Sequence, residues 1–527
     1  MATVLKDKKA IVLKLREPSR VTTVIPTAKL VQHKGSTLVA VPHRPDETRV
    51  LRQLGFKDIP DPLKTHYVFP KASGKFNPFE AQIETANFLS MHNRCFCLNS
   101  MGLGKTVSSL YAYDYMRKNK QVNKVLIICP LSTMERTWAD EVFKTFPHLD
   151  AVVVYGTRER RLRLLKQDAH IYIINTDGIK TIEKELAART DIDLVIVDEI
   201  AMFRNSSTTR WKTLDKILNK QNVPRRVWAL TGAPTPNDPT DAWAQCRVVT
   251  PHNPDVPKYF GKFRDTVMRQ ISQFKWVPRD NAPDIVKQMM QPAVRFALDD
   301  CVDLPEQIFI TRATELTDEQ IRAYKDMLSK LAAEYEGGQI LAVNQAVKAN
   351  KLVQIACGVA YAADGSHIVL PNEPRLAVLE EVIEESEGKV IVFVPLTGVL
   401  ENVAERLSKR WSVACVHGET SKNERDEIFS NFQKTTDPHI LVANPGTMSH
   451  GLTLTAATNI VWFAPIHSND VYEQACARVR RPGQTRTTVI VHIAGSEIER
   501  KIYQRLQGKQ KLQGLLLELM KDVGENP

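Results

Sequence analysis

Two blocks of the chain alternate short, almost wholly apolar runs with segments of helix length. The first block contains KVLIICP, AVVVY, IYIIN, DLVIVDE and RVWALTG, and the second contains KVIVFVP, SVACVHG, HILVANP, NIVWFAP and TVIVHIA. A continuous apolar run indicates a strand that is buried on both faces. Strands of this kind, separated by helices, form parallel sheets with helices on both sides. The sequence therefore predicts an α/β fold with two parallel-sheet lobes.

The positions of these blocks divide the chain, which at 527 residues is too long for a single hydrophobic core. Residues 1–70 are basic and predicted to be β-rich, with AIVLKL, VTTVI and TLVAVP as strands. Residues 71–250 and 373–527 hold the two lobes, and the second lobe is predicted to end in an amphipathic helix. Residues 251–372 are predicted to form a mostly helical insertion and linker.

Composition narrows the class of protein. The net charge of +11 favours a polyanionic partner such as nucleic acid, although 71 basic against 60 acidic residues is also compatible with ordinary solubility. No apolar run approaches the roughly 18 residues of a membrane helix. The N-terminus carries charges throughout, unlike a signal peptide. The eight cysteines lack the spacing of a zinc site. We therefore expect a cytoplasmic protein with no membrane partner.

The stretch LNSMGLGKT, residues 98–106, follows the apolar run RCFCL and precedes a helix-compatible segment. This order directs backbone N–H groups and a helix N-terminus at one point, where a phosphate can bind. Lys105 is then expected to reach the β- and γ-phosphates of ATP, and the Thr106 hydroxyl is expected to bind Mg²⁺. A GKT tripeptide also occurs in ordinary turns. The predicted ATP-binding loop comprises Asn99, Ser100, Met101, Gly102, Leu103, Gly104, Lys105 and Thr106.

A second candidate is the acidic pair in DLVIVDEI. The apolar run places Asp198 and Glu199 at the carboxyl end of a predicted strand, where ligands bind in open α/β sheets. Asp198 can hold Mg²⁺, and Glu199 can take a proton from the attacking water. A solvated acidic pair at a strand end is the ordinary alternative, but the phosphate loop upstream favours the catalytic interpretation.

Four segments together resemble the first motor motifs of the SWI/SNF family of helicase superfamily two. They are NSMGLGKT, VLIICPLSTMERTWADEVFKTF, VIVDEIAMFRNSS and VWALTGAPTPNDPTDAW. The resemblance covers about residues 76–510 and implies two RecA-like lobes and a DNA-dependent ATPase that uses ATP and Mg²⁺. It also implies an adenine contact for Gln82, for which an exposed helical glutamine is the alternative. The family usually has histidine where Ala201 stands, which implies altered coupling between nucleotide state and the other motifs.

The segment VYEQACARVRRPGQTRTTVIVHIAG resembles the last motif of the same family. The resemblance places Gln474 at the ATP site. Arg478 and Arg481 are three residues apart, which puts them on one face of a predicted helix. The resemblance implies that they act as arginine fingers that neutralise charge at the γ-phosphate. A solvated basic helix is the alternative.

Other motifs with this resemblance imply contacts to DNA or a role in coupling. In short polar loops, turn formation is the ordinary alternative. The residues concerned are Thr231, Gly232, Thr420, Ser421, Asn444 and Gly451.

The sequence thus predicts a monomeric ATP-dependent translocase that tracks on double-stranded or branched DNA. Repair, recombination or fork remodelling in a bacterial or phage-infected cell is the expected setting. Residues 1–70 are expected either to recognise the DNA substrate or to support the first lobe. Two other functions stay open: a strand-separating DNA or RNA helicase, and an ATP-binding DNA scaffold that does not hydrolyse ATP.

Overall fold

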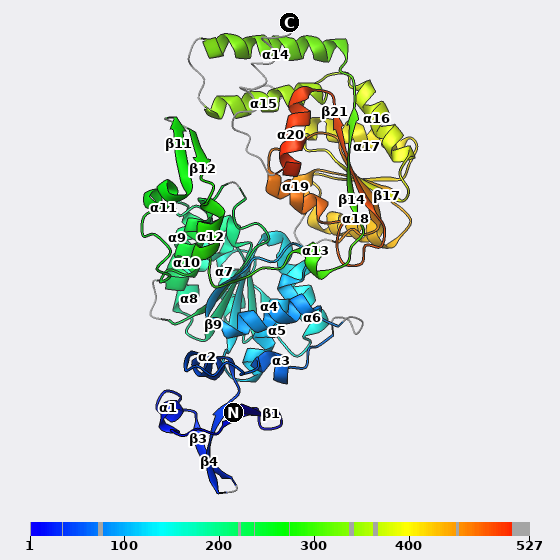
Figure 1. The fold of residues 1–527 in the computed structure, drawn as a ribbon. Coiled ribbons are helices and arrows are strands. Elements are labelled where there is room, and N and C mark those ends of the chain that lie inside the picture. Colours follow the sequence, from blue (N-terminus) through cyan, green and yellow to red (C-terminus); the bar gives the residue numbers. More distant parts are fainter. Residues whose placement is uncertain are drawn as a thin grey trace. The chain divides into compact units, whose positions relative to one another are not determined.

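The computed structural model forms two compact units, Met1–Cys301 and Val302–Pro527, each with one large parallel sheet (Figure 1). No helix among the described residues is long and apolar enough to cross a membrane. The structure describes residues 2–33, 35–71, 77–219, 223–236, 238–272, 275–336, 342–361, 367–448 and 453–508.

The first unit begins with a small antiparallel sheet in the order β1-β2-β4-β3. Its strands are β1 (Ala2–Leu5), β2 (Ala10–Leu13), β3 (Lys29–His33) and β4 (Ser36–Pro42). The prediction of a strand over VTTVI is wrong, because α1 (Ser19–Thr22) covers its first two residues and a turn follows. The physical reason is that Val21 and Ile25, four residues apart, share one side of a helical turn and are both buried in the core under the small sheet.

Three helices lead from this small sheet into the first lobe: α2 (Pro45–Gln53), α3 (Pro62–His66) and α4 (Glu80–Met91). The hydrophobic core changes along this path. Ile59 still packs in the core of the small sheet, whereas Leu63 and Tyr67 pack in a core of the first lobe. The last residues of the segment 1–70 are therefore part of the packing of the lobe.

The first lobe contains a seven-stranded sheet in the order β13-β5-β10-β9-β6-β8-β7, and every pair in it is parallel. Successive residues of β5 point to opposite faces, since Cys95 packs in one core and Phe96 in another. This confirms the predicted parallel sheet with two covered faces. The strands are β5 (Arg94–Cys97), β6 (Lys124–Cys129), β7 (Ala151–Val153), β8 (Ile171–Asn175), β9 (Ile192–Asp198), β10 (Arg226–Leu230) and β13 (Ala293–Val294).

Helices and helical turns connect these strands. Among them, η2 (Met134–Ala139) is a π-helix, the wider helical form that often marks functional positions. The others are α5 (Lys105–Lys118), η1 (Leu131–Thr133), α6 (Asp140–Thr145), α7 (Arg158–Leu165), η3 (Gly178–Ile182), α8 (Glu183–Ala188), η4 (Ile200–Phe203), α9 (Thr209–Asn219) and α10 (Asp241–Val249).

The segment 251–372 contains helices, as predicted, but it also contributes a strand to each large sheet. In the first unit, Phe96 N donates to Pro292 O at 3.0 Å and Leu98 N to Val294 O at 2.8 Å, so β13 covers the outer edge of β5. In the second unit, β14 is an outer strand. The elements are α11 (Phe260–Val267), β11 (Met268–Ser272), β12 (Lys275–Pro278), α12 (Ala282–Met289), α13 (Leu298–Cys301), β14 (Gln307–Ala313), α14 (Asp318–Glu336), α15 (Ala342–Ala356), β15 (Val359–Tyr361) and β16 (His367–Val369).

The second unit has a parallel sheet in the order β14-β21-β20-β17-β19-β18, as predicted for the second lobe. The rest of the predicted C-terminal helix beyond Gly508 lies outside the described residues. The elements are α16 (Glu373–Glu384), β17 (Lys389–Phe393), α17 (Thr397–Ser408), β18 (Val413–Val416), α18 (Lys422–Lys434), β19 (Ile440–Ala443), η5 (Pro445–Thr447), β20 (Ala457–Trp462), α19 (Asn469–Cys476), β21 (Thr488–Ala494) and α20 (Glu497–Gly508).

A buried ion pair lies inside the second unit. The Arg375 guanidinium donates to Glu499 Oε1 at 2.7 Å, and both side chains are almost fully buried. Glu499 Oε2 also accepts from Gly495 N and Ser496 N, each at 3.0 Å, just after β21. The pair therefore ties α16 and α20 to the carboxyl end of the sheet.

Candidate nucleotide site

The loop between β5 and α5 has the order strand, loop and helix that the sequence predicts for a phosphate site. Gly102 and Gly104 have φ angles of 87° and 72°, a left-handed conformation that favours glycine. Helix α5 begins at Lys105, so its first N–H groups end at this loop. Lys105 Nζ donates to Asn99 O at 2.9 Å and to Ser100 O at 3.4 Å, which holds the ammonium group over the loop.

Asn99 stands where the usual phosphate loop has glycine. Its side chain forms two hydrogen bonds that hold the loop to neighbouring segments. Its side chain is buried, donates to Thr85 Oγ1 at 2.7 Å and accepts from Phe296 N at 2.9 Å. Asn99 thereby connects the loop to α4 and to the chain just after β13. The sequence has no local pattern that predicts these two hydrogen bonds, because both partners are distant from Asn99 along the chain.

Gln82 of α4 lies against the same loop. A Cβ atom placed on Gly104 would lie 2.3 Å from Gln82 Nε2, and Gln82 Oε1 accepts from Phe79 N at 3.1 Å. A side chain at residue 104 would require Gln82 to move, and the positive φ of Gly104 also favours glycine there. The predicted contact of Gln82 with adenine stays a prediction.

Asp198 ends β9 as a buried carboxylate. Trp138 of η2 donates its indole N–H to Asp198 Oδ2 at 2.9 Å. Burial raises the pKa of Asp198 to about 7, the neighbouring Glu199 carboxylate adds to this rise, and the Trp138 and Lys105 side chains oppose it. Sequence reasoning did not single out Trp138, although a tryptophan in the polar segment STMERTWADEV was a signal that could have found it.

Glu199 has a positive φ of 53°, which is uncommon for a residue with a side chain and costs on the order of 1–3 kcal/mol. Its Oε2 accepts from Thr231 Oγ1 at 3.0 Å, just after the neighbouring strand β10. The next residue, Gly232, passes so close to the loop that a Cβ there would lie 3.6 Å from Lys105 Nζ. Three predicted segments therefore meet at the carboxyl edge of one sheet.

The oxygen ligands at this edge fit Mg²⁺, because that ion prefers one or two protein oxygens together with phosphate and water. The Asp198 carboxylate and the Thr106 hydroxyl are the residues that would hold it. Burial raises the pKa of Asp198, and a cation bound beside this carboxylate would favour its ionised form.

In the second unit, the prediction that Arg478 and Arg481 share one face of a helix is wrong. Helix α19 ends at Cys476, and both arginines follow it in turns. For Arg481 the physical reason is Pro482, which disfavours helical backbone at the residue before it, and Gly483 follows with a φ of 101°.

The side chains near this turn are nevertheless anchored. Arg481 Nε donates to Ala477 O at 2.9 Å and Nη1 to Thr453 Oγ1 at 3.3 Å. Burial lowers the pKa of Arg481 to about 10, so it stays protonated at neutral pH. Gln474 lies on α19 and donates to Asp470 Oδ1 at 3.0 Å. The roles of Gln474, Arg478 and Arg481 toward ATP stay predictions.

The polar loop residues of the second unit form local turns and caps. His417 N donates to Thr420 Oγ1 at 3.0 Å, and Ser421 Oγ accepts from Glu424 N at 3.4 Å as the N-cap of α18. Asn444 donates to Pro395 O at 3.3 Å, which links the ends of β19 and β17. Gly451 lies outside the described residues. Contacts of these residues with DNA stay predictions.

Comparison with known families gives two matches. The SNF2-related domain matches residues 81–357, and the helicase conserved C-terminal domain matches residues 374–483. The first match contains the loop, the acidic pair and Thr231, and the second contains Gln474, Arg478 and Arg481.

Individual proteins are similar over most of this chain. Putative protein p41 of Acyrthosiphon pisum secondary endosymbiont phage 1 is 26% identical, over 85% of this chain and 99% of that protein. A Xenopus laevis protein named SWI/SNF-related matrix-associated actin-dependent regulator of chromatin subfamily A-like protein 1 is also 26% identical, over 85% of this chain but only 45% of that protein. The chain thus spans less than half of the Xenopus protein. The solved Sulfolobus solfataricus SWI2/SNF2 ATPase core in complex with dsDNA is 22% identical, covers 87% of this chain and 95% of that chain, and has a TM-score of 0.39.

Proposed function

This chain belongs to the SNF2-related family of helicase superfamily two, a family of DNA-dependent ATPases, and we propose that it moves along double-stranded DNA as it hydrolyses ATP. The observation that carries the proposal is the meeting of three motifs at one sheet edge. Lys105, Glu199 and Thr231 come from three different strand ends, and the hydrogen bond between Thr231 and Glu199 joins two of them directly.

In the proposed reaction, Lys105 and the N–H groups at the start of α5 bind the β- and γ-phosphates of ATP. Asp198 and Thr106 hold Mg²⁺, which when bound neutralises phosphate charge. Glu199 accepts a proton from the attacking water, and the Thr231 hydroxyl fixes the orientation of its carboxylate. Arg478 and Arg481 supply positive charge at the γ-phosphate, and Gln474 contributes to ATP binding.

Ala201 stands at the position where the family usually has a histidine, which couples the nucleotide state to the other motifs. The Ala201 side chain has no hydrogen-bonding group, and its backbone carbonyl accepts from Arg204 Nη1 at 3.2 Å. We propose that the hydrogen bond between Thr231 and Glu199 supplies this coupling instead, because it links the catalytic carboxylate to the segment after β10 without a histidine.

The proposed substrate is double-stranded or branched DNA, and the proposed motor is a monomer. The net charge of +11 supports a grip on phosphates, which gives little sequence preference. Thr231, Gly232, Thr420, Ser421, Asn444 and Gly451 remain the proposed DNA-contact or coupling residues. Similarity to the phage protein p41 over nearly its full length supports a role in a bacterial or phage-infected cell, and we propose repair, recombination or fork remodelling as the process.

A triplex-displacement assay tests the proposal. The enzyme is expected to remove a labelled third strand from duplex DNA when ATP is present, and the Lys105→Ala variant is expected not to. Unwinding of a tailed duplex without triplex displacement would favour the strand-separating helicase. Displacement that persists without ATP turnover, or absence of turnover on every DNA, would favour the scaffold.

A further inference from the structure

An appendage of the first unit carries an exposed surface that the ATP site does not use. It is built from α11 and the β11–β12 hairpin, which projects beyond the other elements of this unit in Figure 1. Residues 258–287 of this region contain seven Lys or Arg and three Asp residues. We define the hairpin surface as Tyr259, Lys262, Thr266, Arg269 and Arg279.

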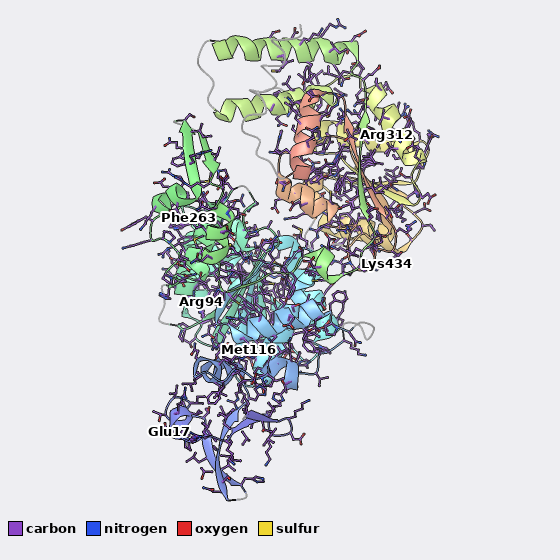
Figure 2. All side chains as sticks on the ribbon, in the orientation of Figure 1. Glu17, Arg94, Met116, Phe263, Arg312 and Lys434 are labelled. Carbon is purple, nitrogen blue, oxygen red and sulfur yellow. The ribbon has the colours of Figure 1, made fainter. Side chains whose placement is uncertain are left out.

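Three of these residues lie at or just before α11. Lys262 and Thr266 are four residues apart and share one face of α11, and Tyr259 is the extended residue immediately before the helix. All three are exposed, and 65% of the Tyr259 side chain surface is accessible. Phe263, labelled in Figure 2, and Val267 lie on an adjoining side of the helix, and both are fully buried.

The same face leads into a polar cavity of about 440 Å³, where Thr266 lies with Arg269 and Arg279. Arg279 Nε donates to Met268 O at 3.0 Å, which fixes this arginine at the base of the hairpin. The remaining lining residues are Asp265, Pro278, Asp280 and Asn281.

The appendage is braced, so the hairpin surface has a defined shape. The Arg264 guanidinium lies 4.1 Å from the centre of the Trp276 ring, which connects α11 to β12. Arg264 Nη2 also lies 3.0 Å from Asp265 Oδ1. This ion pair offsets one of the two carboxylates in the cavity, and Arg269 and Arg279 together outweigh the other, Asp280, by one positive charge.

An exposed aromatic ring beside several basic side chains is the combination that binds single-stranded nucleic acid, because unpaired bases stack on the ring while phosphates meet the cations. Bases inside an intact duplex are already stacked and do not offer this contact. We propose that the hairpin surface binds single-stranded DNA, with a base on Tyr259 and phosphates at Lys262, Arg269 and Arg279. Helix α11, about 12 Å long, gives the surface room for a few nucleotides.

This inference deepens the proposed function, on which it rests for the choice of DNA as substrate. It assigns to the motor a branched substrate with a single-stranded arm. The contact does not require ATP, so its test is independent of the test of the motor.

The test is fluorescence anisotropy with the full chain, without ATP, using a labelled 20-nucleotide single strand and a blunt duplex. Tyr259→Ala is expected to weaken single-strand binding roughly five- to a hundredfold, the range for loss of one base stack. Arg269→Ala is expected to reduce the slope of log K against log salt by about 0.7, the value for one phosphate contact of a single strand. Neither variant is expected to change duplex affinity by more than about twofold.

Matched controls lie elsewhere in the same unit. Tyr155 is also exposed and has Arg161 at 5.4 Å from its ring, and Arg163 is an exposed arginine of α7. Tyr155→Ala and Arg163→Ala are expected to leave single-strand binding unchanged. Unchanged binding in Tyr259→Ala and Arg269→Ala would overturn the proposal, and so would equal losses on the single strand and the duplex. Circular dichroism confirms that each variant is folded.

Discussion

At the scale of single residues, each carboxylate at the end of β9 receives a hydrogen bond from an uncharged side chain. Trp138 donates to Asp198, and Thr231 donates to Glu199. An uncharged donor orients a carboxylate without neutralising it, so the charge stays available for a metal ion or a proton. The two donors come from different elements, η2 and the end of β10, and can therefore be tested separately.

Thr231→Val is expected to lower kcat for ATP roughly ten- to a hundredfold and to change KM by less than about threefold. The reason is that a hydrogen bond to a charged group contributes about 1.5–3 kcal/mol and this one orients Glu199 without contacting ATP in our proposal. Steady-state ATPase kinetics measure both constants. Thr231→Ser keeps the hydroxyl and is expected to retain most activity, whereas equal activity of the valine variant would contradict the orienting role.

Trp138→Phe is expected to raise the Mg²⁺ concentration needed for half-maximal ATP turnover. The indole N–H lowers the pKa of Asp198, so its loss raises that pKa further. Mg²⁺ binding requires the ionised carboxylate, and activity on the acidic side of the pH profile should therefore be lost at a higher pH in the variant. A pH series of Mg²⁺ titrations measures this shift.

Trp211→Phe is the control for this variant, because the Trp211 indole N–H donates to Ala244 O at 2.8 Å and does not contact Asp198. Its Mg²⁺ dependence is expected to match that of the parent protein. A similar shift in both variants would mean that loss of packing, and not the hydrogen bond to Asp198, causes the change.

At the scale of elements, the Arg375–Glu499 pair joins two helices to the second sheet. Burying two charges is costly, and each remaining polar contact of Glu499 offsets part of that cost. The carboxylate accepts from Arg375 and from two backbone N–H groups after β21. Loss of the carboxylate would leave a buried guanidinium without its anion.

Glu499→Ala is accordingly expected to destabilise the protein by about 3–5 kcal/mol. Glu497→Ala is the matched control in the same helix, because Glu497 is exposed and pairs with Arg500 at 3.3 Å. The control is expected to change stability by less than about 0.5 kcal/mol. Urea unfolding measures the stability of both variants. Equal effects would show that the buried ion pair stabilises the protein no more than the exposed one.

The elements that the sequence predicted best are those whose signal is local. Continuous apolar runs such as DLVIVDE are strands of the two parallel sheets, because burial on both faces determines their composition. The prediction of a strand over VTTVI was wrong, since β-branched residues at helical spacing can also bury one side of a turn. The prediction of one helical face for Arg478 and Arg481 was wrong, since α19 ends at Cys476 and Pro482 disfavours helical backbone at Arg481.

The sequence predicted which segments come together at the candidate site, but not the hydrogen bonds that support them. Lys105, Asp198 and Glu199 have short motifs that can be identified along the chain, and their carboxyl-edge positions follow from parallel strands. The brace from Asn99 to Phe296 and the bond from Trp138 to Asp198 join residues far apart in sequence. Such pairs depend on the packed fold and leave no local pattern.

At the scale of the whole molecule, the small N-terminal sheet and the first lobe have separate hydrophobic cores. The chain passes from the first core to the second near residue 60. Ile59 belongs to the first core, whereas Leu63 and Tyr67 belong to the second. The position of a truncation should therefore decide its effect.

Removal of residues 1–60 is expected to preserve basal ATPase activity and to weaken the use of branched DNA. Removal of residues 1–70 also deletes Leu63 and Tyr67, and loss of such buried side chains costs about 2–5 kcal/mol each. A lower thermal midpoint is thus expected for the longer deletion only. If both truncated proteins unfold at the same reduced temperature, the small sheet supports the lobe and is not a substrate module.

The pairing of β5 with β13 has a consequence for how the chain is made. Residues 94–97 leave the ribosome about two hundred residues before Ala293, and β10, the other neighbour of β5, begins only at Arg226. At roughly 5–20 residues per second, the outer edge of β5 waits about 10–40 seconds for its last partner. During translation the phosphate loop therefore precedes the strand and the Phe296 amide that complete it. The nascent chain must keep an apolar strand edge from pairing with other chains for that whole interval.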